Sequence, residues 1–269
     1  MEQVETLIIN HNAGFFSCYT IRLLNILEYI NKHKKCPENV DSSRQFLDYK
    51  NNKNNDYTAE YIELNEQIQI QYTNQIKLTN DTREEQFSDY KLLNFKVIKP
   101  FINKWFSPSE QILQLTQYLE RRYNLDYENL AVFYYRGTDK HTETNLCNYD
   151  IFIDKAKQVR FNNPNVKFLI VSDEIELINL FKGIFPDTIV FDELLQNMER
   201  SFLHSQLMLA TVLIMSKAKH IICTSGNVSL WIILFRGHNN NIHQFLSPRE
   251  YIHGVKNTTF DSKNTTFWI

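Results

Sequence analysis

The chain has 269 residues, of which 43% are hydrophobic and 22% charged, with a net charge of -2 and a pI near 6.5. This composition is typical of a folded globular protein, so it argues against disorder, and the weak charge gives no sign of a nucleic acid or an anionic membrane as partner. At about 150 residues per domain the length is compatible with one large domain or two small ones, and we expect two, at residues 1–125 and 126–269.

The cysteines and the N-terminal residues bear on the compartment. Four cysteines (Cys18, Cys36, Cys147 and Cys223) show neither a CxxC pair nor dense spacing, which indicates reduced thiols. The stretch MEQVETLIINHN has acidic residues where a signal peptide has basic ones, and no run approaches the roughly 20 apolar residues of a membrane span. We therefore expect a cytoplasmic protein without a membrane span. Its oligomeric state stays open.

The first predicted elements form a βα unit. A strand from Val4 to Asn10 leads through the loop HNAGFFS into a helix that ends before Pro37. The helix is predicted by apolar residues at the i, i+3, i+4, i+7 spacing of one helical face, namely Leu23, Ile26, Leu27 and Ile30. Residues 40–100 give no clear pattern, although YIEL and IQIQY are compatible with short strands.

A second helix is predicted to open at SPSE, residues 107–110. Ser107 is a typical N-cap residue, Pro108 suits the first helical position, and Glu110 completes a capping box. From Leu130 onward the pattern alternates between strands and helices. The predicted strands are 130–135, 166–172, 188–193, 220–224 and 241–246, and helices are predicted around 150–159, 174–184, 205–218 and 228–237. Such alternation indicates an α/β fold whose parallel sheet has helices on both faces.

Three loops follow strands of this predicted sheet. They are Arg136–Lys140, Ser172–Glu174 and Thr224–Ser229. Ligands of open parallel sheets bind beyond the carboxyl ends of the strands, so the three loops are candidates for one site. The third leads into a helix whose first N–H groups can bind a phosphate, and an arginine adds a fork of donors that suits a diphosphate.

Absent motifs narrow the chemistry. Neither GxGxxG nor GxxxxGK[ST] occurs, which argues against nicotinamide cofactors and ATP hydrolysis. There is no DxD pair to hold a metal under a diphosphate, so we expect no metal and no cofactor, and positive charge supplied by the protein.

Each loop also has a purely structural interpretation. The TSGN turn is typical of a helix N-cap, and Asp173 can cap a helix that begins near Glu174. Arg136 can form a structural ion pair with a nearby carboxylate.

The run YYRGTDK, residues 134–140, resembles the signature of the fucosyltransferase superfamily, which includes bacterial α-1,2- and α-1,6-fucosyltransferases and protein O-fucosyltransferases. That signature is a strand ending in His-x-Arg-Arg-x-Asp, sometimes followed by lysine. Arg136, Asp139 and Lys140 match it, while Tyr134 and Gly137 replace the histidine and the second arginine. FLIVSDEIELI and IICTSGNVSLWIILFRG are similar to later motifs of the family, and the first loop and helix are similar with Gly14 retained.

The resemblance implies a GT-B-like fold of two Rossmann-like domains with parallel sheets, the C-terminal one the clearer. It implies an inverting, metal-independent glycosyltransferase that takes fucose from GDP-fucose to a glycan or sugar hydroxyl. The nucleotide-sugar is then a co-substrate and no cofactor is required. The donor-binding residues implied are Arg136, Lys140, Asp173, Thr224, Ser225, Gly226, Asn227 and Ser229.

Catalysis would use Arg136 to stabilise the departing diphosphate and a base for the acceptor hydroxyl. The candidates for the base are Glu143, then Asp139, then His141, whose ordinary pKa suits proton transfer near neutral pH. His11, Asn12 and Gly14 form a loop of the N-terminal domain that can approach donor or acceptor. Two alternatives stay open: a glycosyltransferase with another nucleotide-sugar, and an inactive nucleotide-binding or interaction module.

Overall fold

A computed structural model describes residues 6–56, 58–70, 75–138, 140–144, 146–196, 199–246, 251–252, 255–256 and 268–269. The chain divides into two compact units, each assembled from three stretches. The first unit contains Met1–Asn80, Asn94–Tyr118 and Glu193–Val212, and the second contains Asp81–Leu93, Leu119–Asp192 and Leu213–Ile269. These units do not coincide with a single division after residue 125: residues 81–93 and 119–125 belong to the second unit, and residues 193–212 belong to the first.

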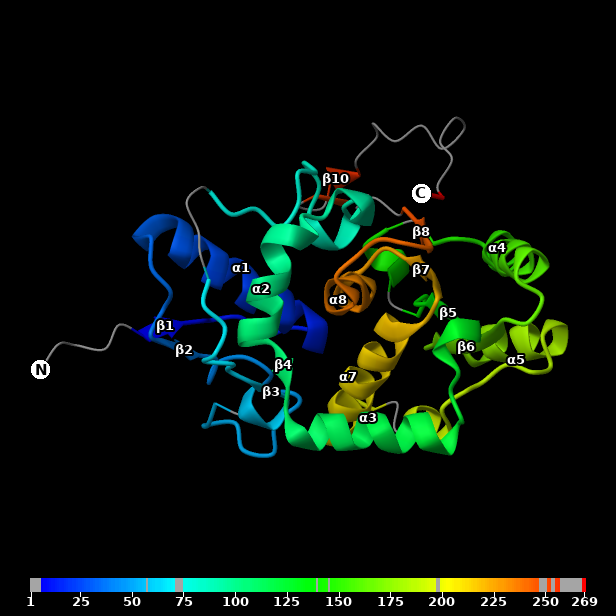
Figure 1. The fold of residues 1–269 in the computed structure, drawn as a ribbon, viewed down its shortest axis with the longest axis horizontal. Coiled ribbons are helices and arrows are strands. Elements are labelled where there is room, and N and C mark those ends of the chain that lie inside the picture. Colours follow the sequence, from blue (N-terminus) through cyan, green and yellow to red (C-terminus); the bar gives the residue numbers. More distant parts are fainter. Residues whose placement is uncertain are drawn as a thin grey trace, which may run out of the picture. The chain divides into compact units, whose positions relative to one another are not determined.

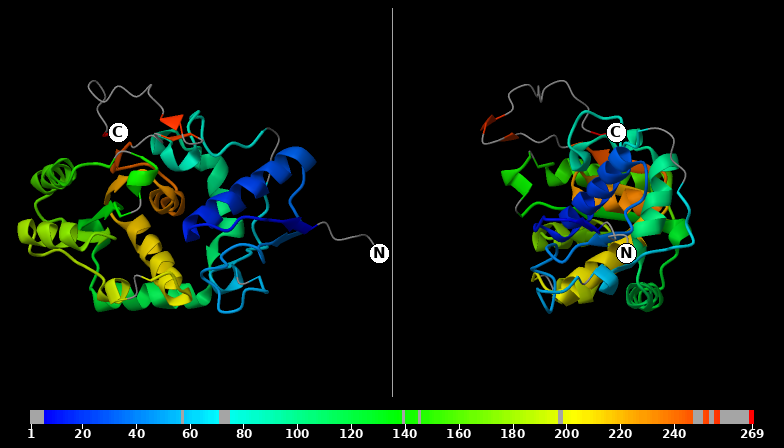
Figure 2. Two further views of the ribbon diagram at one scale, coloured as in Figure 1. Left: turned by 180° about the vertical axis from the view of Figure 1, so that it is seen from behind. Right: turned by 90° about the vertical axis from the view of Figure 1, so that its left-hand side faces the viewer.

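The first unit begins with the predicted βα unit. Strand β1 (Thr6–Ile8) pairs in parallel with β2 (Asn39–Asp41), and helix α1 (Phe15–His33) connects them. The four apolar residues of the predicted helical face are all buried, which confirms that prediction. Figure 2 shows α1 alongside the two strands. A parallel pair needs such a crossover because its strand ends lie at opposite edges.

The remainder of the first unit packs around aromatic side chains. Strand β3 (Ile62–Glu63), within YIEL, pairs antiparallel with β4 (Ser107–Pro108), and α2 (Phe95–Trp105) lies between them in the chain. In IQIQY, residues 68–70 form no strand, and the rest lies outside the described residues. Phe15 contacts the rings of Phe46 and Tyr61 at centroid distances of 5.4 and 4.9 Å.

Helix α3 (Glu110–Arg122) starts two residues later than the capping pattern predicts. Ser107 and Pro108 are extended because they pair with β3, so Ser109 precedes the first helical residue instead. The Ser109 carbonyl accepts from the N–H of Leu113 at 3.0 Å, which is the bond expected of a residue at a helix start. The predicted helix is confirmed, but its predicted first residue, Pro108, is wrong because the helix begins at Glu110.

The second unit contains the predicted parallel sheet. Its strands are β5 (Leu130–Tyr135), β6 (Lys167–Ser172), β7 (His220–Thr224) and β8 (Ile242–Phe245), in the order β6-β5-β7-β8 and all parallel. Every residue of β5 and β7 is buried, which explains the apolar sequence of β5 and of the centre of β7, residues 221–223. Helices α4 (Tyr149–Asn162) and α5 (Ile175–Ile184) lie on one side of this sheet and α8 (Asn227–Arg236) on the other (Figure 1). The α/β fold with a parallel sheet is thus confirmed.

The predicted strand 188–193 does not form. Only Ile189 bridges to Leu169 of β6, and α6 (Asp192–Gln196) starts three residues later, which leaves too few residues for a ladder. Helix α7 (Phe202–Lys217) follows. The remaining elements are 3₁₀ turns at Thr58–Glu60, Glu85–Phe87, Tyr90–Leu92, Tyr127–Asn129 and Lys140–Thr142, and an antiparallel pair of β9 (Tyr251–Ile252) and β10 (Val255–Lys256).

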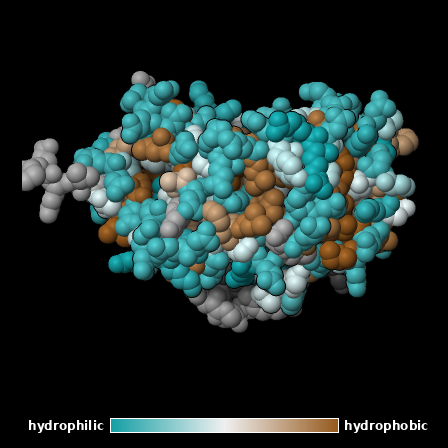
Figure 3. Space-filling model, turned by 90° about the horizontal axis from the view of Figure 1, so that it is seen from below, coloured by the Kyte–Doolittle hydropathy of each residue, from teal (hydrophilic) through white to brown (hydrophobic). Residues whose placement is uncertain are grey.

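Some large apolar side chains are exposed, among them Phe161 at 85% and Ile8 at 54%. Figure 3 shows one face on which hydrophobic patches alternate with hydrophilic surface. Scattered exposed apolar side chains are normal for a folded protein. Among the described residues, no helix is both long and apolar enough to cross a membrane.

Candidate functional site

The predicted loops meet at one edge of the second unit's sheet. Tyr135, the last residue of β5, lies opposite Ser172, the last of β6, and Tyr134 lies opposite Cys223 near the end of β7. In the order β6-β5-β7-β8, the next strand of the chain after β5, which is β6, lies on one side of β5, whereas β7 and β8 lie on its other side. The order therefore reverses between β5 and β7, and such switch points are where open α/β sheets bind ligands.

Arg136 follows β5 at this edge. Its Nε lies 3.9 Å from Oδ2 of Asp173, and both side chains are partly exposed, at 38% and 27%. The other oxygen of Asp173, Oδ1, accepts a hydrogen bond of 3.0 Å from the N–H of Gly137. One carboxylate thus joins the loops after β5 and β6, so the predicted ion pair is present, although its separation is long.

Asp173 does not cap the following helix. Helix α5 begins at Ile175, and the N–H of Glu174 is bonded to the hydroxyl of Ser172 at 3.1 Å. The Asp173 carboxylate turns instead toward Gly137 and Arg136. Glu174 faces the same loop, where its carboxylate accepts a hydrogen bond from the Tyr149 hydroxyl. Burial and this contact raise the pKa of Tyr149 to about 12.

Lys140 supplies a second cation, and it is buried. Its Nζ donates to Oε2 of Glu143 at 2.7 Å and to Oε1 of Gln86 at 3.4 Å, and it lies 5.3 Å from the centre of the Phe87 ring. A β-carbon placed on Gly226 would lie 3.9 Å from this nitrogen. The lysine therefore reaches the start of α8 from the loop after β5.

The turn after β7 is held by several hydrogen bonds. Thr224 ends the strand, and both the N–H and the hydroxyl of Ser225 donate to the carbonyl of Phe245, at 3.2 and 3.3 Å. Gly226 adopts φ 157° and ψ 167°, a backbone conformation essentially limited to glycine. Asn227 starts α8, and its Nδ2 donates to Gln86 at 3.0 Å.

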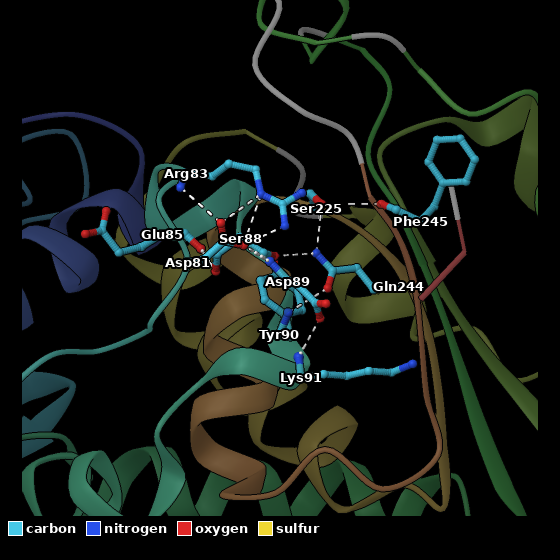
Figure 4. A network of polar contacts seen from close by, with 10 residues as sticks. All are labelled: Asp81, Arg83, Glu85, Ser88, Asp89, Tyr90, Lys91, Ser225, Gln244 and Phe245. Atoms are coloured by element: carbon cyan, nitrogen blue, oxygen red, sulfur yellow. Dashed lines mark hydrogen bonds and ion pairs between the residues drawn. The ribbon is translucent and has the colours of Figure 1, made fainter. Parts of the chain in front are cut away.

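Residues 81–93 pack on this turn, although they lie far from it in the sequence. Gln244 links the two: its Nε2 donates to the Ser88 carbonyl and to the Ser225 hydroxyl, each at 2.9 Å, and its Oε1 accepts from the N–H of Tyr90 (Figure 4). The Tyr90 hydroxyl accepts from the N–H of Gly226 at 3.1 Å and contacts its carbonyl at 3.0 Å. No periodicity or motif in residues 81–93 marks them for this role.

Ser229 does not fit the predicted contact with a diphosphate. Its side chain is fully buried and lies beside the thiol of Cys223 in β7. Burial raises the pKa of Cys223 to about 12, which is the mark of an apolar environment. Ser229 thus belongs to the interior of the second unit.

The remaining predicted residues lie elsewhere. His141 is exposed, and Asp139 lies outside the described residues. In the first unit, His11 bonds Ser17 at 3.1 Å, and the side-chain oxygen Oδ1 of Asn12 accepts from the N–H of Leu47 at 2.9 Å. Gly14 precedes α1 with φ -55°, and a β-carbon there would meet open space, so the turn itself does not require glycine.

Within the described ranges, His, Cys, Asp and Glu side chains form no group of three or more that could hold a metal ion. No model of a known protein family matches the chain, and no curated protein matches its sequence. Among solved structures, selenomethionine fucosyltransferase NodZ from Bradyrhizobium aligns over 90% of this chain and 95% of its own, with a TM-score of 0.55 and 9% identity. The chain has a fucosyltransferase-like fold.

Shorter alignments match two other NodZ structures, an α-1,6-fucosyltransferase soaked with GDP-fucose and the same enzyme co-crystallized with GDP. They have TM-scores of 0.40 and 0.38 and identities of 10% and 12%. Each of these two alignments covers 56% of this chain. The chain spans about half of the length of the matched proteins, 49% of the first and 48% of the second. Over the 90% of this chain that aligns with the selenomethionine structure, the fold is GT-B-like, with Rossmann-like α/β units of which the second is the clearer.

Proposed function

We propose that the protein is an inverting, metal-independent glycosyltransferase that transfers fucose from GDP-fucose to a glycan or sugar hydroxyl. One observation carries the proposal. In a fold like that of a fucosyltransferase, the loops after β5, β6 and β7 bring Arg136, Lys140 and the start of α8 to the switch point of a parallel sheet. The motif resemblance of residues 134–140 supports the donor.

In this proposal Arg136 and Lys140 stabilise the diphosphate as the bond to the sugar breaks. Negative charge grows on the oxygen that leaves, so fixed cations stabilise the transition state more than the bound donor. The first N–H groups of α8 and the Asn227 amide add further donors. Arg136 would exchange its 3.9 Å contact with Asp173 for a contact with phosphate.

The acceptor hydroxyl needs a base, and Glu143 remains our first candidate. It lies one turn beyond Lys140 and its side chain is 39% exposed, so a sugar can reach it. Asp139 and His141 are the other candidates. Transfer inverts the anomeric carbon when the acceptor oxygen attacks opposite the departing diphosphate.

A glycosyltransferase with a different donor is a second candidate, and Gly137 favours it. The fucosyltransferase signature has an arginine at this position, but here the carboxylate of Glu174 fills the space beside the glycine. The replacement of that arginine by glycine removes one positive charge from the site. An inactive module that binds a nucleotide is the third.

The nucleotide and the chemistry can be tested together. We expect GDP to raise the melting temperature more than UDP does, and GDP to be released from GDP-fucose in the presence of EDTA. Arg136→Ala should lower this release by about 100-fold, the cost of losing one charged donor in a preorganised site. Arg121→Ala, at an exposed arginine of α3, serves as control. A larger shift with UDP would favour the second candidate, and GDP binding without turnover on any acceptor would favour the third.

A further inference from the structure

The ammonium of Lys140 is held at a fixed position in the second unit. The side chain is buried, with its nitrogen above the Phe87 ring and against Gly226. Gln86 fixes it from one side, because the Gln86 Nε2 donates to Glu84 at 2.7 Å and so turns its Oε1 toward Lys140. The same oxygen accepts from Asn227. The position of the charge is therefore set by groups that a ligand would not displace.

Glu143 meets this ammonium from the exposed side. The turn from residue 140 brings it there, since the Glu143 N–H donates to the Lys140 carbonyl at 2.9 Å. The carboxylate then accepts from the ammonium at 2.7 Å, with 39% of the Glu143 side chain exposed and only 9% of the Lys140 side chain. One partner of the pair is fixed, and the other can move into solvent.

A carboxylate therefore occupies the place on Lys140 where a phosphate oxygen would bind. Partly exposed ion pairs are weak because water competes for both charges. A diphosphate carries more charge than a carboxylate and can also bind Arg136 and the start of α8. Its binding would thus displace Glu143 from the lysine.

We propose that the Glu143 carboxylate is an internal place-holder, by which we mean that it occupies the position of the donor phosphate on Lys140 until the donor binds. Donor binding then releases Glu143 to act as base. The inference rests on the proposed function and deepens it by setting the order of binding, donor before acceptor. Once unpaired, the carboxylate takes the proton of the acceptor hydroxyl while the acceptor oxygen bonds to the anomeric carbon. The bond from that carbon to the diphosphate breaks at the same time, and its electron pair leaves on the diphosphate.

Calorimetric titration with GDP, UDP and inorganic pyrophosphate tests the place-holder. Glu143→Gln removes the competing charge, so it should tighten the binding of these anions by up to about fivefold, which corresponds to the upper end of the range measured for exposed pairs. Lys140→Met should weaken binding by about tenfold or more, and in its background Glu143→Gln should have no effect. Hydrolysis of GDP-fucose by water should fall in Glu143→Gln although the nucleotide binds more tightly.

Asp154→Asn is the matched control. It makes the same change in net charge and also breaks a partly exposed i,i+3 pair with a lysine, Lys157 at 2.8 Å, but on α4. Its affinities should equal those of the wild type. Unchanged or weaker binding of every anion by Glu143→Gln, in protein with wild-type circular dichroism, would overturn the inference.

The outcomes separate the two proposals. If the wild type prefers UDP and Glu143→Gln tightens UDP binding, the GDP-fucose function fails and the place-holder stands. If the wild type prefers GDP and Glu143→Gln does not change its affinity, the function stands and the place-holder fails. If no variant binds GDP, UDP or pyrophosphate, both fail.

Discussion

The carboxylate of Glu174 occupies the space beside Gly137 in which a β-carbon would lie. The two residues come from loops after neighbouring strands, β5 and β6. The carboxylate also accepts a hydrogen bond from the hydroxyl of Tyr149, at the start of α4. A side chain at position 137 and the present position of Glu174 are therefore mutually exclusive.

Gly137→Ala should lower the free energy of unfolding by about 1 kcal/mol, because Glu174 must rotate away and lose its hydrogen bond to Tyr149. Urea denaturation measures this loss. In a Glu174→Ala background the same substitution should cost nothing, since the backbone of Gly137 is not in the left-handed region and the β-carbon then meets no carboxylate.

Gly183→Ala provides the control for this prediction. Gly183 lies in α5, where a β-carbon would meet open space, so alanine should stabilise the protein by about 0.5–1 kcal/mol. Equal costs for Gly137→Ala with and without Glu174 would show that the two residues are not coupled.

Tyr90→Phe should lower the free energy of unfolding by about 1–2 kcal/mol, because it removes the buried hydroxyl that accepts from the N–H of Gly226. The ring is kept, so packing changes little. Tyr118→Phe, where the tyrosine is 41% exposed, should change stability by less than about 0.5 kcal/mol. If denaturation gives both variants the same stability, Tyr90 does not hold the turn.

The parallel sheet was predictable from the sequence because β5 and β7 are buried along their whole length, so β5 and the centre of β7 are apolar. The role of residues 81–93 was not. Their bonds reach Gly226 and Gln244, 136 to 156 residues away, and no local pattern records such contacts. The burial of Ser229 was not predictable for a similar reason, since the sequence of a helix start does not tell which of its polar residues face inward.

Asp81→Asn should destabilise residues 81–93. The Asp81 carboxylate accepts from Nε and Nη2 of Arg83, at 3.0 and 2.6 Å, and from the N–H of Asp89 at 2.8 Å. Burial alone would raise the pKa of Asp81, but these hydrogen bonds lower it to about 2. The ionised Asp81 carboxylate therefore stabilises the folded protein fully above the ordinary pKa of about 4, and this stabilisation is lost as the pH falls toward 2.

At pH 7 we expect Asp81→Asn to cost about 2 kcal/mol in urea denaturation. The difference from the wild type should shrink between pH 4 and pH 2, because protonation of Asp81 then removes the same interactions. Asp154→Asn, at a partly exposed pair, should show no comparable loss. A difference that is constant over this pH range would contradict the assignment.

The two histidines at the β7–β8 pair make stability depend on pH in the mildly acidic range. The rings of His220 and His243 stack with centroids 6.1 Å apart and planes 11° from parallel. Burial, followed by the charges of Lys155, His220 and Lys91, lowers the pKa of His243 to about 4. The folded protein therefore resists protonation that the unfolded chain accepts near its ordinary pKa of about 6.5. The stabilisation that comes from the lowered pKa of His243 is fully present above about 6.5 and is lost as the pH falls toward 4.

His243→Phe keeps an aromatic ring on β8 and removes the titrating group. Between pH 7 and pH 4.5 the wild type should lose about 2 kcal/mol more unfolding free energy than this variant, measured by urea denaturation at each pH. His141→Gln replaces an exposed histidine and should follow the wild-type curve. Parallel curves for the wild type and His243→Phe would place the acid sensitivity elsewhere, because a partly buried histidine with a lowered pKa must contribute to the slope in this range.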